Sequence, residues 1–321
     1  MFSIRFPPRP RRHRFLHGSG EAAQRGIGFG PGVAYRLCPQ RAGAYSLGVI
    51  RKPAVAGQFY PADAGQAWAW IEQLWPREPC QPSTATAVIM PHAGWMYSGA
   101  TAAIAASHVT VPDCVILLGP NHHNLGHPYA VFARGTWQLP VGDVAVDEAT
   151  ANELLTRCDL LRDDAWAHSR EHSLEVEVPF LMRTNPRMQI VPIVIGGPWP
   201  DSGDRARLRA IARAVAETVA HRGQPVLLVA STDFNHYEDQ RTTERKDRLA
   251  LEAIEHRDPE LLMDRVQKHD ISMCGVAPTY ITLHAANQLG AQTARILDHR
   301  TSGDVSGDYQ AVVGYAAAVI Q

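Results

Sequence analysis

Metal-binding and acid–base side chains follow three short apolar segments of this sequence, each at the point where the segment ends. The segments and the side chains after them are Ala87–Met90 with His92, Val115–Leu118 with His122 and His123, and Val226–Ala230 with Asp233 and His236. Apolar runs of this length, bounded by turn residues, are typical of strands buried on both faces of a parallel sheet. Ligands of open α/β sheets bind beyond the carboxyl ends of such strands. We therefore predict that these side chains form one site.

The histidines of this predicted site favour a metal ion. Neutral imidazole is the commonest metal-binding side chain, and two or three converging histidines with an acid or a thiol make a metal site. His92 stands before Ala93 and Gly94, so little bulk surrounds its ring. Because adjacent residues rarely both bind one ion, we expect one ligand from His122 and His123, and a packing or supporting role for the other.

Cys274 is the cysteine whose position favours chemistry. It precedes Gly275 and a predicted helix, and a thiol at a helix N-terminus has a lowered pKa, which suits a nucleophile or a metal ligand. The alternative is a small buried hydrophobic residue, which we expect for Cys114 and Cys158 in apolar segments. Cys274 with a histidine base would also serve a Cys-dependent hydrolase, although three His/Asp groups at strand ends exceed what a dyad needs.

Other ionisable residues near these segments could serve either acid–base chemistry or helix capping. Asp233 and His236 could form an acid–base pair, or Asp233 could cap the following helix. His172 could be a proton shuttle or a capping partner. Glu175 and Glu177 are expected on the solvated face of a helix.

The composition excludes several classes of protein. The chain has 321 residues, 45% of them hydrophobic and 20% charged, which is typical of a globular protein. A net charge of −1 argues against nucleic-acid binding through a basic surface. No apolar run reaches the roughly 18 residues of a membrane span, and no P-loop or GxGxxG motif indicates a nucleotide. Five scattered cysteines without a CxxC pair indicate a reducing compartment, and we expect a cytoplasmic protein.

The chain divides into a basic extension and one folded domain. Residues 1–48 carry clustered arginines, prolines and glycines without periodicity, so we expect disorder or a wrongly assigned start, with a transit peptide as the alternative. Residues 51–321 alternate apolar strand patterns with amphipathic helix patterns, which predicts a single α/β domain with a mixed, largely parallel central sheet flanked by helices. Helices are expected at 64–74, 99–108, 147–158 (N-cap Asp147), 173–182, 204–219, 242–256, 258–267 and 275–289, and strands at 87–90, 115–118, 129–133, 189–195, 226–230, 292–298 and 309–320, with a hairpin at 137–146.

Seven ordered motifs of the sequence resemble the Memo family, called AmmeMemoRadiSam system protein B in prokaryotes. They are AVAGQFYP at 54–61, PHAGW at 91–95, LGPNHH at 118–123, EHSLE at 171–175, STDFNHY at 231–237, CG at 274–275, and SGD at 302–304 continuing to VGYAA at 313–317. The resemblance covers residues 51 to 321.

The resemblance implies a fold similar to that of the class III extradiol dioxygenases, which are non-haem iron enzymes. Carried over by motif, His92, His122 and Cys274 look like metal ligands, and His172, Asp233 and His236 look like their surroundings. The dioxygenases use two histidines and a carboxylate, whereas the third position here is Cys274, a softer ligand that admits copper and zinc beside iron and makes ring cleavage doubtful. The family also implies a functional link to radical-SAM and AMMECR-type proteins.

Three functions from different classes remain open on these residues. We expect a metal-binding protein with a redox role, which could be a dioxygenase-like oxidoreductase with an unknown small-molecule substrate. The alternatives are a non-enzymatic metal carrier or peptide-binding scaffold, and a Cys-dependent hydrolase. An enzyme should keep an open coordination position with His172 and His236 directed inward, whereas a carrier should show an accessible site with a closed ligand set.

Overall fold

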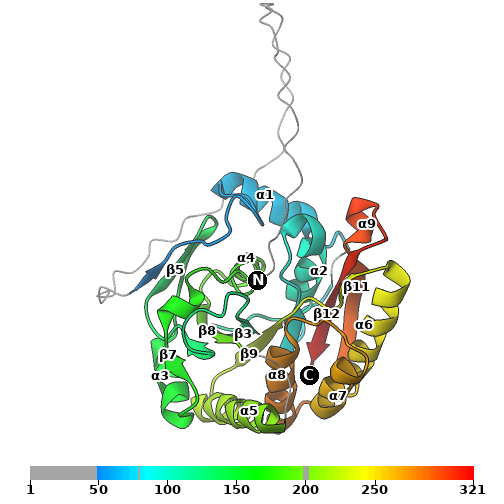
Figure 1. The fold of residues 1–321 in the computed structure, drawn as a ribbon. Coiled ribbons are helices and arrows are strands. Elements are labelled where there is room, and N and C mark those ends of the chain that lie inside the picture. The colour runs from blue at the N-terminus through cyan, green and yellow to red at the C-terminus, as the bar shows by residue number, and fades with distance from the viewer. Residues whose placement is uncertain (1–48, 79, 198–201) are drawn as a thin grey trace, which may run out of the picture. The chain divides into compact units, whose positions relative to one another are not determined.

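The computed structural model describes residues 49–78, 80–197 and 202–321, so the expectations for residues 1–48 lie outside the described residues. Strands and helices alternate along most of the chain, which confirms the predicted α/β class (Figure 1). The helices are α1 (Ala64–Leu74), α2 (Trp95–Ser107), α3 (Glu148–Arg157), α4 (Val178–Thr184), α5 (Ser202–Arg222), α6 (Gln240–Glu255), α7 (Pro259–Lys268), α8 (Val276–Gln288) and α9 (Gly303–Ser306), with a 3₁₀ turn η1 at Ala165–His168. The strands are β1 (Ile50–Arg51), β2 (Ala87–Met90), β3 (Cys114–Pro120), β4 (Tyr129–Val131), β5 (Thr136–Leu139), β6 (Gly142–Ala145), β7 (Arg162–Asp163), β8 (Gln189–Ile195), β9 (Val226–Ser231), β10 (His236–Glu238), β11 (Ala294–Thr301) and β12 (Val312–Ile320).

The main sheet is mixed, with a parallel centre. Its strand order is β10-β12-β2-β9-β3-β8-β4-β7, and β11 pairs with β12. Strands β2, β9, β3 and β8 are mutually parallel, while β12 and β4 run antiparallel to their neighbours β2 and β8. The parallel strands β2, β9 and β3 therefore end at the same edge of the sheet, which is where the predicted site residues follow them.

Central strand β3 shows why the apolar runs become strands. Every residue of Cys114–Pro120 is buried, and Ile116 pairs with Val191 of β8 on one side and Leu228 of β9 on the other. A strand covered on both faces needs a continuous apolar run, as the sequence pattern indicated.

Helices cover both faces of this sheet. Helices α1, α2 and α4 lie on one face, and α3, α5 and α8 lie on the other (Figure 1). The hairpin predicted at 137–146 is β5–β6, and with β1 it forms a separate small sheet. No helix in the described part of the chain combines the length and apolarity needed to cross a bilayer.

Most predicted boundaries agree with the structure within a few residues, but two helices start elsewhere. Helix α2 begins at Trp95, four residues before the predicted Gly99, which lies inside the helix. A Cβ on Gly99 would meet Leu74 of α1 at 2.7 Å, so glycine permits close packing of the two helices there. Helix α4 begins at Val178 and not at Ser173, because Pro179 is tolerated in a first turn but not inside a helix.

Candidate metal centre

The structure brings the three predicted metal ligands together. His92 follows β2, His122 follows β3, and Cys274 lies just before α8. One ligand atom from each, an imidazole nitrogen or the thiol sulfur, lies within 4.8 Å of the other two. The rings of His92 and His122 meet edge to face, with centroids 5.1 Å apart. Residues separated by up to 182 positions thus form one cluster.

His92 is held in one tautomer by Ser231, the last residue of β9. The Ser231 hydroxyl donates to the carbonyl oxygen of Ser173 at 2.9 Å, so it must accept the proton of His92 Nδ1, which lies 2.7 Å away. His92 Nε2 is then unprotonated, and it lies 3.2 Å from Cys274 Sγ. Burial, followed by the neighbouring His122, lowers the pKa of His92 well below its ordinary value, so the ring is neutral. A neutral imidazole with a free Nε2 is the form that binds metal.

His122 is oriented in the same way by Glu171. The Glu171 carboxylate accepts the His122 Nδ1 proton at 2.8 Å and also the His122 backbone N–H at 2.6 Å. Burial alone would raise the pKa of Glu171, but the hydrogen bond and charge of His122 hold it well below its usual range. Burial likewise opposes the charge of His122, yet hydrogen bonds to Cys274 and Glu171 raise its pKa to about 10. With Nδ1 engaged by an ionised acceptor, Nε2 is the nitrogen left for a ligand.

Gly275 brings Cys274 onto the end of strand β9. A Cβ at position 275 would lie 2.2 Å from the Ser231 carbonyl oxygen and 2.4 Å from Cβ of Thr232. The Gly275 N–H donates to Thr232 Oγ1 at 3.0 Å, and the Asp233 N–H donates to Cys274 Sγ at 3.3 Å. The close approach of this loop to β9 therefore requires glycine, and it sets the position of the sulfur.

The expected lowering of the Cys274 pKa is wrong. Burial of the thiol raises the pKa of Cys274 and the charge of Asp233 adds to this, while the hydrogen bond from His122 opposes it. The position at a helix N-terminus is outweighed because the residues around the thiol desolvate it. A cation bound at this point would stabilise the thiolate form of Cys274.

His172 lies against the two predicted histidine ligands. Its ring stacks on His122 with centroids 4.6 Å apart and meets His92 edge to face at 5.6 Å. Burial and the charge of His122 lower the pKa of His172 to about 4, which leaves the ring neutral at pH 7. His122, Glu171 and His172 also form a second group with ligand atoms within 4.8 Å.

Asp233 and His236 lie at the same end of β9 but do not hydrogen-bond each other. Asp233 accepts the backbone N–H of His92 at 2.8 Å, and burial raises its pKa. The capping alternative for Asp233 is wrong, since the N-cap of the next helix, α6, is Asp239. His236 Nδ1 lies 2.8 Å from the carbonyl oxygen of Ser272.

The expectation that Glu175 and Glu177 lie on a solvated helix face is wrong, because both are fully buried. Glu175 forms an ion pair with buried Arg51 at 2.7 Å and accepts hydrogen bonds from Tyr60 and from the backbone of residues 54 and 55. This pair ties the start of the domain to the turn that carries Glu171. Glu177 has a pKa raised well above its ordinary value by burial and is therefore neutral.

The other cysteines and histidines of the described part of the chain fall outside the ligand cluster. Of the adjacent pair, His122 enters the cluster and His123 does not. Cys114 and Cys158 are buried, as predicted.

Sequence reasoning missed two residues that orient the ligands, Glu171 and Ser231. Glu171 precedes His172, and Ser231 follows the apolar run Val226–Ala230. Both residues belong to motifs of the sequence, but no function was predicted for either. The signal that could have found them is the rule that a metal-binding histidine donates its second ring proton to a carboxylate or another acceptor.

This arrangement can hold a cation through two imidazole nitrogens and a thiolate. The cation would take the place of the second ring proton that the raised pKa of His122 holds at pH 7. Such a set of nitrogen and sulfur donors suits transition metals and not the oxygen-seeking Mg²⁺ or Ca²⁺. The neutral ring of His172 beside the cluster can accept a proton from a group bound there.

Comparison with known proteins places the chain in a family. A family model described as Memo-like protein matches residues 51–319. A MEMO1 family protein of Ignicoccus hospitalis is 39% identical over 283 residues, which cover 84% of this chain and 98% of the relative. MEMO1 family proteins of Methanopyrus kandleri and Thermotoga petrophila are 38% and 40% identical, each over 84% of this chain and 99% of the relative. The chain belongs to the Memo family.

Proposed function

We propose that this protein binds one metal ion through Nε2 of His92, Nε2 of His122 and Sγ of Cys274, and that the centre has a redox role. The observation that carries the proposal is the fixed orientation of two imidazoles. Each ring donates its Nδ1 proton to an acceptor behind it, Ser231 or Glu171, and directs Nε2 into the cluster that contains the thiol.

Iron and copper are the metals that we propose, with zinc as the redox-inert alternative. Thiolate is a soft ligand that favours Cu(I), zinc and iron, and imidazole suits all three. A bound iron or copper ion would supply electron transfer and a coordination position for a substrate. The chain's own residues would position and desolvate that substrate and move its protons.

We propose proton-transfer roles for two further histidines. His172 is neutral at pH 7 and packs on His122, so it can take up a proton from a group at the metal. His236 stands at the end of β9 on the carbonyl of Ser272, with Asp233 nearby. We propose that these three residues serve acid–base chemistry in an enzymatic function toward a small-molecule substrate.

Metal content of anaerobically purified protein tests the ligand set. We expect near one equivalent of iron or copper in the wild type and a loss in His92→Ala, His122→Ala and Cys274→Ala. The matched controls are His123→Ala, an exposed histidine adjacent to a ligand, and Cys158→Ser, a buried cysteine outside the cluster. A wild type that is metal-free and cannot be reconstituted would overturn the proposal.

Nitric oxide binding to the iron-loaded protein separates an enzyme from a carrier. An open coordination position gives an iron–nitrosyl electron paramagnetic resonance signal, whereas a closed ligand set gives none. A carrier should also release its metal to a chelator faster than an enzyme does.

A Cys-dependent hydrolase is the second candidate, because Cys274 Sγ lies 3.2 Å from His92 Nε2, as in a thiol–imidazole dyad. The raised pKa of Cys274 and the lowered pKa of His92 both oppose an ion pair between them. A hydrolase would be alkylated readily at Cys274 without metal and would keep its activity in chelator.

A further inference from the structure

His236 is attached to the loop that carries Cys274. The backbone N–H of His236 donates to Ser272 Oγ at 2.7 Å, and its Nδ1 lies 2.8 Å from the carbonyl oxygen of the same serine. Ser272 stands two positions before Cys274, and the Asp233 N–H donates to Cys274 Sγ at 3.3 Å. Contacts with a single residue therefore hold His236 beside the metal centre.

The contact at Nδ1 decides which ring nitrogen of His236 carries a proton. A carbonyl oxygen can only accept a hydrogen bond, so the proton between His236 and Ser272 belongs to Nδ1. The neutral ring then keeps Nε2 without a proton, as in His92. A bare Nε2 is the nitrogen that can accept a proton from a bound group.

Asn235 holds Ser272 in this position. Asn235 is fully buried, and its Oδ1 accepts the N–H and the hydroxyl of Ser272 at 3.1 and 3.2 Å. Because a backbone N–H can only donate, Oδ1 must face Ser272, and Nδ2 then donates to the Glu238 carboxylate at 2.6 Å. The backbone N–H of Asn235 donates to buried Asp247 of α6 at 2.9 Å. The Asn235 amide thus binds residues on both sides of position 237.

The backbone of Tyr237, between the two residues that Asn235 holds, is strained. Tyr237 has a φ of +61°, in the left-handed region that an aromatic residue rarely adopts. The register of β10 against β12 shifts at this point, between His236 and Glu238. Strain of this kind persists when the surrounding contacts over-determine the backbone, and it concentrates at functional sites. This observation is independent of the His236 ring.

We propose that Asn235, acting through Ser272, positions His236 for proton transfer at the metal centre, an inference that rests on the proposed function for the acid–base role of His236. Asn235 is fully buried, so it is a positioning residue and does not meet a substrate. Without its amide, Ser272 loses two hydrogen bonds and no longer fixes the ring. His236 would then sample both tautomers, and Nε2 would carry the proton in part of the molecules.

Nitrogen-15 NMR of the full chain with labelled histidine, in the presence of diamagnetic zinc, measures the tautomer of His236. The His236 signals are those that disappear in His236→Gln, and alkaline pH keeps an ordinary histidine neutral. We expect the form with protonated Nδ1 in roughly tenfold excess, because the other tautomer loses a hydrogen bond. Asn235→Ala and Ser272→Ala should bring the two forms close to equal, whereas Ser272→Thr should retain the excess.

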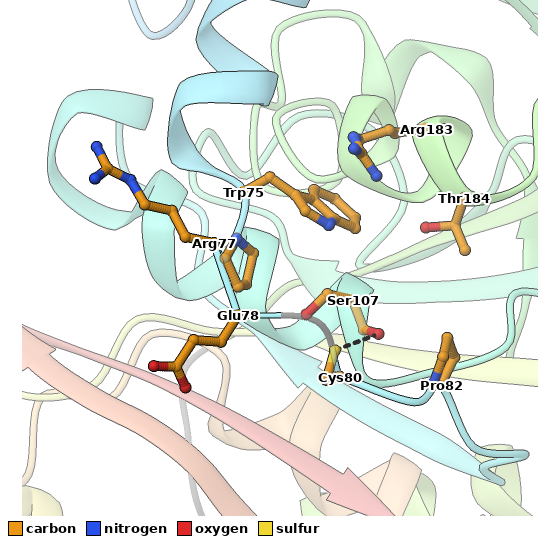
Figure 2. A pocket seen from close by; sticks show the side chains of 9 residues that line it. Trp75, Arg77, Glu78, Cys80, Pro82, Ser107, Arg183 and Thr184 are labelled. Atoms are coloured by element: carbon orange, nitrogen blue, oxygen red, sulfur yellow. Dashed lines mark hydrogen bonds between the residues drawn. The ribbon is translucent and has the colours of Figure 1, made fainter.

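Ser107→Ala is the matched control for loss of a serine hydroxyl. Ser107 Oγ donates to the carbonyl oxygen of Ile104 at 2.8 Å, and Ser107 lies in the wall of a cavity with Trp75 and Cys80 (Figure 2). The residues that line this cavity do not include Asn235 or Ser272. The tautomer of His236 should therefore be unchanged in Ser107→Ala.

Tyr237→Gly tests the strain separately. Glycine adopts a φ of +61° without penalty, so this variant should melt a few degrees higher than the wild type. The same substitution in Asn235→Ala should give a smaller gain, because the backbone can then relax. A Tyr237→Gly variant that melts below the wild type would contradict the strained arrangement.

Two further results would overturn the positioning role. One is an equal tautomer ratio in wild type and Ser272→Ala, a surface variant that keeps the test valid if Asn235→Ala does not fold. The other is loss of zinc from Ser272→Ala, which would show that the contacts hold Cys274 and not His236. A wild type that binds no metal but keeps one His236 tautomer, lost in Ser272→Ala, would contradict the proposed metal function and support the positioning of His236.

Discussion

Ser231 fixes the tautomer of His92, because its Oγ lies 2.7 Å from His92 Nδ1 and commits its own proton to the carbonyl oxygen of Ser173. The last residue of one strand thereby decides which nitrogen of a histidine after the neighbouring strand is free. Parallel pairing of β2 with β9 places the two residues side by side, since Met90 pairs with Ser231.

Ser231→Ala should lower metal affinity about tenfold, because His92 loses the acceptor that orients it. Competition with a chromophoric chelator under anaerobic conditions measures this effect. Ser231→Thr keeps the hydroxyl and should retain most of the affinity, while Ser169→Ala removes a surface hydroxyl as a control. Equal affinity in Ser231→Ala and wild type would contradict the orienting role.

Glu171→Gln should weaken metal binding by roughly 10-fold to 100-fold. The variant keeps the size of the side chain but removes the negative charge that orients His122 through the 2.8 Å hydrogen bond. The same chelator competition applies, with Glu255→Gln on the exposed end of α6 as the control. If the two variants bind metal equally well, Glu171 has only a structural role.

Gly275→Ala should destabilise the fold by about 1–3 kcal/mol and abolish metal binding, since its Cβ would collide with the Ser231 carbonyl oxygen. Urea unfolding and metal analysis measure the two effects. Gly65→Ala, in the first turn of α1, is the matched control, because helix propensity favours alanine there by up to about 1 kcal/mol. Wild-type stability in Gly275→Ala would show that the loop moves to make room.

Acid should destabilise the protein through His168. Burial, with the charge of Arg51, lowers the pKa of His168 to about 3, whereas an unfolded histidine titrates near pH 6.5. Between these values the unfolded chain binds one more proton than the native chain, so this contribution is fully present above pH 6.5 and is lost as the pH falls. The expected slope is about 1.4 kcal/mol per pH unit.

His168→Gln tests this contribution, because its amide can still donate to the Ala130 carbonyl oxygen but does not titrate. Urea unfolding at pH 7, 6 and 5 should show a smaller loss of stability in the variant than in the wild type. His256→Gln, an exposed histidine, should keep the wild-type slope. Parallel slopes for His168→Gln and wild type would assign the acid sensitivity to other groups.

The amino-acid sequence determined the element types and the edge of the sheet at which the site lies. Continuous apolar runs such as Val115–Leu118 are typical of strands buried on both faces of a parallel sheet. The carboxyl ends of such strands lie at one edge of the sheet, so the sequence predicts that His92 and His122 lie close together. Helix α1 agrees with its prediction at both ends because the residues that bound it act locally. In the structure Asp63 accepts the Gln66 N–H at its start, and the helix ends before Trp75 and Pro76. Features that depend only on residues adjacent in sequence can be predicted without the tertiary structure.

Only the tertiary structure decided the properties that depend on neighbours distant in sequence. Glu175 follows a solvated-face pattern, yet Arg51, 124 positions away, makes its burial tolerable. The pKa of Cys274 rises instead of falling because burial in the assembled cluster outweighs the adjacent helix. The roles of Glu171 and Ser231 likewise appear only when other segments bring the histidines to them, since hydrogen bonds and desolvation act through space and not along the chain.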